Sequence, residues 1–97
     1  MYRPKYTKKD ANQAQIISDC HDLGIYVWDI SNEGGEKLDT VMFWKERAVP
    51  VEIKRVGYTE ADFTKGERLC IEKFKAMGIP FIVATSAEDV VNGWPTS

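Results

Sequence analysis

The apolar residues of this chain recur with a helical period in three segments of the sequence. In the first two segments a glycine, Gly24 or Gly78, follows the last apolar residue and is expected to end the helix. The predicted helices extend from Lys8 to about Leu23, from Thr64 to Met77 and from Ala87 to about Trp94. The expected N-caps are Thr7, Thr64 and Ser86, and the expected buried stripes contain Ile16, Ile17 and Cys20, then Cys70, Ile71, Phe74 and Met77.

Four runs rich in β-branched and aromatic residues predict strands between these helices, at residues 25–31, 38–44, 48–55 and 79–84. The second and third runs flank the polar turn Lys45-Glu46-Arg47, which predicts an antiparallel hairpin, and residues 57–63 are expected to form a loop. Pro50 has no N–H to donate, so it indicates a strand start or an edge. The last strand follows a helix and can therefore run parallel to an earlier one, which predicts an α/β sandwich with a mixed central sheet.

A chain of 97 residues fits one small domain, and its basic residues 1–6 are expected to form a flexible arm. Hydrophobic residues make up 43% and charged residues 29%, which is typical of a globular protein and not of a disordered one. The net charge of −2 argues against a nucleic-acid coat protein. We expect reduced core cysteines, no signal peptide and no membrane span, and hence a cytoplasmic protein.

The candidate chemistry lies in Leu38-Asp39 and in Val51-Glu52-Ile53-Lys54. Glu52 and Lys54 are two residues apart on a predicted strand, so both side chains point to one face, and the hairpin can bring Asp39 beside them. Two carboxylates that converge without a paired cation repel each other, and a divalent metal ion would relieve this repulsion. Oxygen ligands of this kind favour Mg²⁺ or Mn²⁺ over zinc. The alternative is a solvent-facing Glu52–Lys54 pair on an edge strand.

Asp39 followed by Glu52-Ile53-Lys54, in this order of elements, resembles the PD-(D/E)XK nuclease superfamily. The similarity is greatest to its small VRR-NUC branch, which is often seen in phage genomes and resembles Holliday-junction resolvases in fold. The resemblance implies a restriction-endonuclease-like α-β-β-β-α-β-α sandwich, with residues 1–97 as a single nuclease domain. Its further pieces are Asp10-Ala11-Asn12-Gln13 with Ile16-Ile17, Gly24, Phe63-Thr64-Lys65-Gly66-Glu67, Gly78, Phe81-Ile82-Val83 and Ser86-Ala87-Glu88-Asp89.

The resemblance also implies roles for the residues of this stretch. Asp39 and Glu52 would bind the metal ion through their side chains, and Ile53 would bind it through its carbonyl oxygen. Lys54 would orient the attacking water, help to deprotonate it, or stabilise charge in the transition state. The metal ion itself is expected to be Mg²⁺ or Mn²⁺.

Two polar residues on the predicted helices occupy positions that the family also uses. Gln13 stands where the first helix of the family often carries a glutamate, and because glutamine is the weaker ligand, we expect one metal ion instead of two. Glu67 stands where the family usually has a glutamine, so we expect it at the catalytic site. The alternative for Glu67 is a capping box with Thr64, and both roles can hold together.

The expected function is that of a metal-dependent DNA endonuclease that hydrolyses phosphodiester bonds, with branched DNA such as a Holliday junction among its candidate substrates. The resemblance implies a homodimer that presents two active sites. A second hypothesis is a catalytically inactive module with a nuclease fold that binds nucleic acid or a protein partner. It is motivated by Gln13 and by the acidic charge balance, whereas the intact set of Asp39, Glu52 and Lys54 favours the enzyme.

Four other residues or residue types bear on the site less strongly. Asp29 can approach it from the first strand, although a surface position or capping of the strand end is favoured. His21, the only histidine, lies at the margin of a helical stripe and is a weak candidate for a general base. Tyr58 is a candidate for contact with nucleic acid, and the three tryptophans are expected in core or dimer packing.

Overall fold

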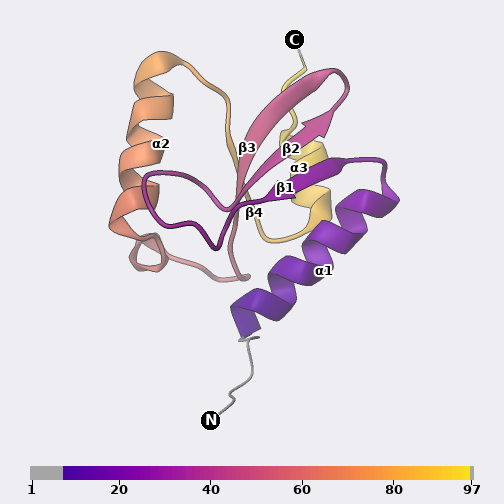
Figure 1. Cartoon of the computed structure of the whole chain (residues 1–97), viewed down its shortest axis with the longest axis horizontal. Coiled ribbons are helices and arrows are strands. Elements are labelled where there is room, and N and C mark those ends of the chain that lie inside the picture. Colours follow the sequence, from indigo (N-terminus) through magenta and orange to yellow (C-terminus); the bar gives the residue numbers. More distant parts are fainter. Residues whose placement is uncertain (1–7, 97) are drawn as a thin grey trace.

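The computed structural model describes residues 8–96 and shows three α-helices and four strands in the predicted order, with an additional 3₁₀ turn before the second helix (Figure 1). The α/β class and the α-β-β-β-α-β-α order are therefore confirmed. The expected arm at residues 1–6 and the expected N-cap Thr7 lie outside the described residues. The elements are α1 (Lys8–Asp22), β1 (Tyr26–Asp29), β2 (Thr40–Trp44), β3 (Arg47–Ile53), η1 (Glu60–Asp62), α2 (Lys65–Met77), β4 (Ile82–Ala84) and α3 (Ala87–Gly93).

The strands form one mixed sheet in the order β1-β2-β3-β4. β1 pairs antiparallel with β2, β2 pairs antiparallel with β3, and β4 pairs parallel with β3. The sequence predicted the hairpin of β2 and β3 and a last strand parallel to an earlier one, but not which strand would be its neighbour. Between β2 and β3 only Lys45 and Glu46 form the turn, with φ of 51° and 63°. Two central residues with positive φ match the right-handed twist of a hairpin. The prediction that Arg47 belongs to the turn is wrong, because it pairs with Trp44 as the first residue of β3.

Pro50 lies in the middle of β3, so the prediction that it starts the strand is wrong. Its position is nevertheless a local edge. Within residues 8–96, β4 pairs only with the segment from Val51 to Ile53, and Pro50 is opposite Val41 of β2 with no strand neighbour on its other side. The missing N–H therefore leaves no break in the pairing with β4.

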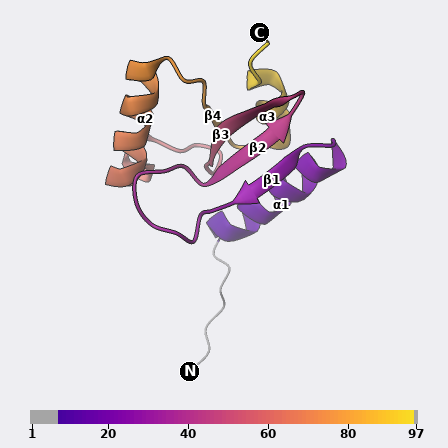
Figure 2. The ribbon, with the colours of Figure 1, turned by 45° about the horizontal axis from the view of Figure 1, so that its top comes forward.

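Helices α1 and α3 pack against one face of the sheet, and α2 lies on the other side of it (Figures 1 and 2). The main core fills the space between the sheet and helices α1 and α3. It is continuous from Ile16 and Cys20 of α1 to Val90 of α3. Its sheet members are Met42, Val49, Val51, Ile53, Ile82 and Ala84. The opposite face near the end of β3 is consequently left for polar residues that meet α2.

Helix α2 begins and ends as predicted. Thr64 and Glu67 form a capping box, and Gly78 closes the helix in the left-handed conformation with φ of 70°. Cys70 is buried, but Met77 is 70% exposed, so the prediction that Met77 belongs to the buried stripe is wrong. The helical pattern places Met77 on the apolar face of α2, but the last turn of the helix extends beyond the residues that pack against this face.

Cys20 and Cys70 are free and buried, as expected for core thiols. Among residues 8–96, no helix combines the length and the apolar character that a membrane crossing requires.

The tryptophans differ in their surroundings. Trp94 is buried and packs edge-on against Trp44, with 5.7 Å between ring centroids, whereas Trp28 on β1 is 52% exposed.

Candidate metal centre

The side chains at the end of β3, and that of Lys54 directly after it, alternate between the two faces of the sheet. Val51 and Ile53 are fully buried in the main core. Glu52, with no exposed surface, and Lys54, with 2% exposed, point to the opposite face toward α2. The alternation predicted from the sequence is thus observed, but the alternative of a solvent-facing Glu52–Lys54 pair is wrong. Burial of two ionisable groups requires compensating partners.

Asp39 precedes β2 and meets Glu52 through paired contacts with the backbone. The Asp39 N–H donates to Glu52 Oε1 at 2.9 Å, and the Ile53 N–H donates to Asp39 Oδ2 at 3.3 Å. Each carboxylate is therefore held by a backbone N–H of the chain segment that carries the other. The expectation that the hairpin brings Asp39 and Glu52 together is met, and the backbone of Ile53 adjoins the pair.

Glu67 joins these two carboxylates from the first turn of α2. Its Oε1 accepts the Thr64 N–H at 3.0 Å, so the capping role and the position at the site hold together. Oxygens of Asp39, Glu52 and Glu67 all lie within 4.8 Å of one another, and all three residues are buried. The sequence placed Glu67 near the site, but it did not identify this residue as the third member of a carboxylate cluster.

Lys54 is the cation of this cluster. Its Nζ lies 3.0 Å from Glu52 Oε2 and 3.0 Å from Glu67 Oε1, and it donates to the Asp62 carbonyl at 2.6 Å. The expectation that the carboxylates converge without a paired cation is therefore wrong. Three carboxylates against one ammonium group still leave an excess of negative charge when all are ionised. We call Asp39, Glu52, Glu67 and Lys54 the carboxylate cluster.

The electrostatics of the cluster differ from one carboxylate to the next. Burial, and then the charge of Asp39, raise the pKa of Glu52 from 4.5 to about 8. Glu52 Oε2 is close to the ammonium group of Lys54, but it accepts no well-formed hydrogen bond. Burial also opposes ionisation of Glu67, yet the Thr64 N–H and Lys54 outweigh it and lower the pKa of Glu67. One buried carboxyl group thus remains poorly compensated.

Lys54 is held in its charged form. Burial alone would lower its pKa, but its hydrogen bond to Glu67 and its ion pair with Glu52 outweigh burial and raise it. The Lys54 carbonyl accepts a hydrogen bond from Asn12 Nδ2 of α1 at 3.2 Å, which ties this end of β3 to the first helix. The ammonium group also lies 4.6 Å from the centroid of the Phe63 ring. The cation is thus fixed from several elements.

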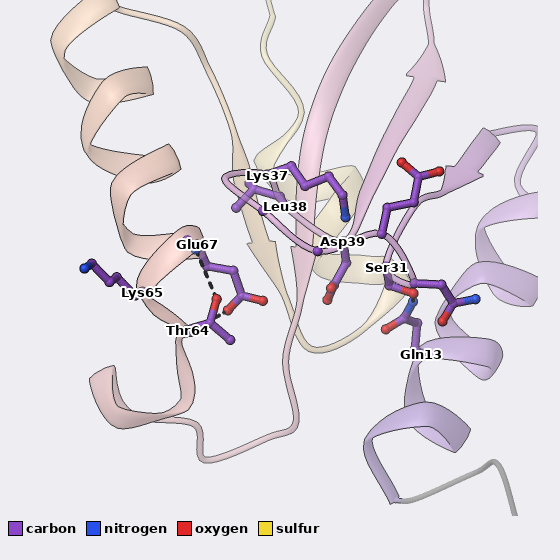
Figure 3. A pocket seen from close by; sticks show the side chains of 13 residues that line it. Gln13, Ser31, Lys37, Leu38, Asp39, Thr64, Lys65 and Glu67 are labelled. Carbon is purple, nitrogen blue, oxygen red and sulfur yellow. Dashed lines mark hydrogen bonds between the residues drawn. The ribbon is translucent and has the colours of Figure 1, made fainter.

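A pocket of about 530 Å³ opens beside the cluster, between α1, the loop before β2 and the start of α2. Figure 3 shows Gln13 reaching into it from α1 and Glu67 from α2, with Asp39 between them. Gln13 is 6% exposed, and its amide nitrogen donates to Asp29 and to Ser31. The expected approach of Gln13 to the site is therefore observed, although it does not belong to the carboxylate cluster.

The remaining candidates lie further from the cluster. His21 is exposed and does not line the pocket beside the cluster, so the structure adds no support to its weak candidacy as a general base. Tyr58 is 38% exposed and packs edge-on against Phe63. The carbonyl of Asp62 was not anticipated as a partner of Lys54. The segment from Thr59 to Asp62 is itself a capping box, and this pattern of threonine followed by aspartate three residues later could have revealed η1.

The donor set of the cluster suits a hard divalent cation. Carboxylate oxygens are the ligands that Mg²⁺ and Mn²⁺ prefer, and three of them from separate elements converge here. The raised pKa of Glu52 indicates that added positive charge would be accepted at this point. Asp39, Glu52 and Glu67 could therefore hold such an ion, with Ile53 adjoining them; Asp39 and Glu67 also line the pocket, whereas Glu52 lies behind them without exposed surface.

The pocket wall contains a close backbone contact that yields a prediction. A Cβ atom at Gly66, in the first turn of α2, would lie 2.4 Å from the Gly35 carbonyl oxygen. We expect Gly66→Ala to displace the helix start or the loop and to lower the free energy of unfolding by about 1–3 kcal/mol. Helix propensity alone would instead raise the free energy of unfolding by up to about 1 kcal/mol. The sign of the change, measured by urea unfolding, therefore distinguishes the steric effect from helix propensity. Gly34→Ala, where a Cβ meets open space, is the control.

Comparison of the chain with protein-family models, with curated proteins and with solved structures finds no match.

Proposed function

We propose that this protein is a metal-dependent DNA endonuclease of the PD-(D/E)XK type, similar to the VRR-NUC branch, which hydrolyses phosphodiester bonds. The observation that carries the proposal is the buried convergence of Asp39, Glu52 and Glu67, with Lys54 beside the last two, next to an open polar pocket. The order of elements and the mixed sheet are compatible with a restriction-endonuclease-like fold, which is part of the same proposal.

In this proposal Asp39, Glu52 and Glu67, with the carbonyl of Ile53, hold one Mg²⁺ or Mn²⁺ ion. When bound, such an ion polarises a phosphoryl group and lowers the pKa of a coordinated water molecule. The carboxylates come from the approach to β2, from β3 and from the start of α2, so the site is fixed by three separate elements. Glu52 accepts a hydrogen bond from the Asp39 N–H, and Asp39 accepts one from the Ile53 N–H. These bonds position the two carboxylates before any ion binds.

Lys54 acts in this proposal as a fixed positive charge. Its raised pKa means that the group is protonated near neutral pH, so it is unsuited to remove a proton from water. An ammonium group held by Glu67 and by the Asp62 carbonyl can instead orient the attacking water or stabilise negative charge on the transferred phosphoryl group. Of the three roles implied by the resemblance, the electrostatic ones are favoured.

A purely structural role explains the cluster less well. The ion pair of Lys54 with Glu67 would satisfy both groups without a further carboxylate. Glu52 is nevertheless placed beside them without any exposed surface, at a cost reflected in its pKa of about 8. Strongly perturbed carboxyl groups beside a pocket are typical of functional sites. The excess carboxylate is therefore better explained by a cation-binding role.

DNA and a second copy of the chain are the proposed partners. The overall negative charge does not oppose a DNA substrate, because the acidic ligands themselves contribute to it. The aromatic side chains of Tyr26 and Trp28, 60% and 52% exposed on the edge strand β1, are a candidate surface for the homodimer. Light scattering at micromolar concentration tests the dimer independently of the nuclease activity.

The proposed function predicts cleavage of plasmid, linear duplex or four-way-junction DNA in Mg²⁺ or Mn²⁺ and none with chelator. Asp39→Asn should lower the rate at least ~10³-fold, because several kcal/mol of transition-state stabilisation depend on the bound ion. The amide oxygen can still accept the Ile53 N–H, so the fold should persist. Gel assays with equal amounts of protein measure the cleavage rate, and circular dichroism measures whether the fold persists.

The matched control is Glu72→Gln, which removes an exposed carboxylate from the same helix that carries Glu67. This variant should cleave like the wild type. Divalent-metal binding by the wild type without any cleavage product would favour the inactive nucleic-acid or protein-binding module. Equal activity of Asp39→Asn and the wild type would refute the proposed site.

A further inference from the structure

The geometry points to Asp29 and Ser31 as positioning residues that fix the Gln13 amide with its carbonyl oxygen toward the pocket. This inference gives the Asp29–Ser31 pair a function that the sequence did not indicate, and its significance for catalysis rests on the proposed function. Gln13 belongs to α1, Asp29 ends β1 and Ser31 follows it. The three side chains therefore join the first helix to the end of the edge strand, beside the pocket.

The donors and acceptors in this group allow only one orientation of the amide. Gln13 Nε2 donates to Asp29 Oδ1 at 3.2 Å and to Ser31 Oγ at 2.9 Å, which uses both of its hydrogens. The Ser31 hydroxyl donates its own proton to Asp29 Oδ1 at 2.6 Å, so its oxygen is the acceptor for Gln13. The Ser31 N–H also donates to Asp29 Oδ1, at 3.0 Å. A carboxylate can only accept, and a reversed amide would set two oxygens against each other.

The consequence is that Gln13 Oε1 is left for the pocket. This oxygen accepts no hydrogen bond from any residue in the described range 8–96, although the residue is only 6% exposed. Gln13, Asp39 and Glu67 line the same pocket, and their side chains enter it from different sides (Figure 3). The oxygen is not among the fully buried atoms that lack a partner, so it is open to the pocket and available to water or to a hydrated cation.

We call the hydrogen-bonded group of Gln13, Asp29 and Ser31 the clamp. The clamp also explains why a neutral residue stands at position 13. The carboxylate cluster already carries more negative than positive charge, and a neutral oxygen adds an acceptor without increasing this excess. A glutamate in place of Gln13 would set its carboxylate against Asp29, about 3 Å away, with no proton between them. Asp29 thus selects an amide at position 13, and the amide oxygen would contact the hydration shell of the ion held by Asp39.

Reversal of donor and acceptor tests the clamp. Asp29→Asn keeps the size of the side chain but introduces an amide donor, so the Gln13 amide can turn its NH₂ group toward the pocket. We expect Mn²⁺ affinity, measured by calorimetry, to fall about 10-fold, an effect typical of residues that support metal ligands. The double variant Asp29→Asn with Gln13→Glu restores an oxygen toward the pocket, because the new carboxylate can accept from the new amide. It should recover most of the affinity, whereas Gln13→Glu alone should be the least stable of the three.

A second readout does not depend on metal or on cleavage. The Gln13 side-chain amide protons in the metal-free wild type should exchange with solvent slowly in NMR spectra, and this protection should disappear in Asp29→Asn. Fast exchange in the wild type would overturn the inference, and so would unchanged Mn²⁺ affinity in Asp29→Asn or no recovery in the double variant. If the protection and the affinities follow the expected pattern but no DNA is cleaved, the clamp stands and the proposed nuclease function fails.

Discussion

We expect Glu52→Gln to abolish DNA cleavage and, without metal, to raise the free energy of unfolding at pH 8. A pKa of about 8 in place of 4.5 means that ionisation of Glu52 in the folded protein is unfavourable by about 4–5 kcal/mol, at about 1.4 kcal/mol per pKa unit. Glutamine removes this cost but sets its NH₂ group near the Lys54 ammonium. A net gain of about 2 kcal/mol is therefore the expected result.

The sign of the effect can be checked through its pH dependence. The folded protein retains the Glu52 proton up to a pKa of about 8, whereas the unfolded chain releases it near pH 4.5. The contribution of Glu52 to stability is therefore greatest below pH 4.5 and is lost as the pH rises toward 8. Urea unfolding of wild type and Glu52→Gln at pH 5 and pH 8, both with chelator, measures the difference. A gain that does not increase between these pH values would contradict the assigned cause.

The second large effect is expected for Lys54→Met, which should abolish cleavage and lower the free energy of unfolding by about 3–5 kcal/mol. The substitution keeps an unbranched side chain but removes the only cation from the carboxylate cluster. Glu67 and Glu52 then remain buried without the ammonium group that lies 3.0 Å from each. The two inactive variants should thus shift stability in opposite directions, a result that general damage to the fold would not produce.

Lys75→Met is the matched control, because Lys75 lies on the same helix as Glu67 and is exposed. Its unfolding free energy should change by less than about 1 kcal/mol, as for other surface substitutions. Combining Glu52→Gln with Lys54→Met should recover part of the lost stability, since one buried charge is removed with the other. If Lys54→Met were as stable as the control, the ion pairs of Lys54 would have no energetic role.

The parts of the fold that depend on local periodicity could be predicted from the sequence. The alternation of Val51, Glu52, Ile53 and Lys54 between two faces follows from the strand period alone. The capping box of Glu67 was equally readable from its spacing to Thr64. The usual rules of connection were sufficient to predict the β2–β3 hairpin, a last strand parallel to an earlier one, and the approach of Asp39. The order of the strands across the sheet was not predicted.

Other features depend on packing that no local pattern records. The local edge at Pro50 follows from the short extent of β4, which the sequence placed at residues 79–84 and the structure confines to Ile82–Ala84. The exposure of Met77 follows from where α2 loses its cover.

At the site, too, some features follow from the local sequence and others depend on packing. The bond from Lys54 to the Asp62 carbonyl depends on the path of the loop before α2. The meeting of Gln13 with Asp29 depends on how α1 docks on β1, across 16 residues of sequence. The residue types at the site were therefore predictable, while their partners, and hence the charged state of Lys54, were not.

The central claim is that Asp39, Glu52 and Glu67 bind one divalent ion between them. A crystal grown with Mn²⁺ at pH 8 and measured for anomalous scattering tests this most directly. We predict a single strong anomalous peak per chain within coordination distance of all three carboxylates. A peak that lies elsewhere, or a carboxylate cluster without any peak at saturating Mn²⁺, would contradict the claim.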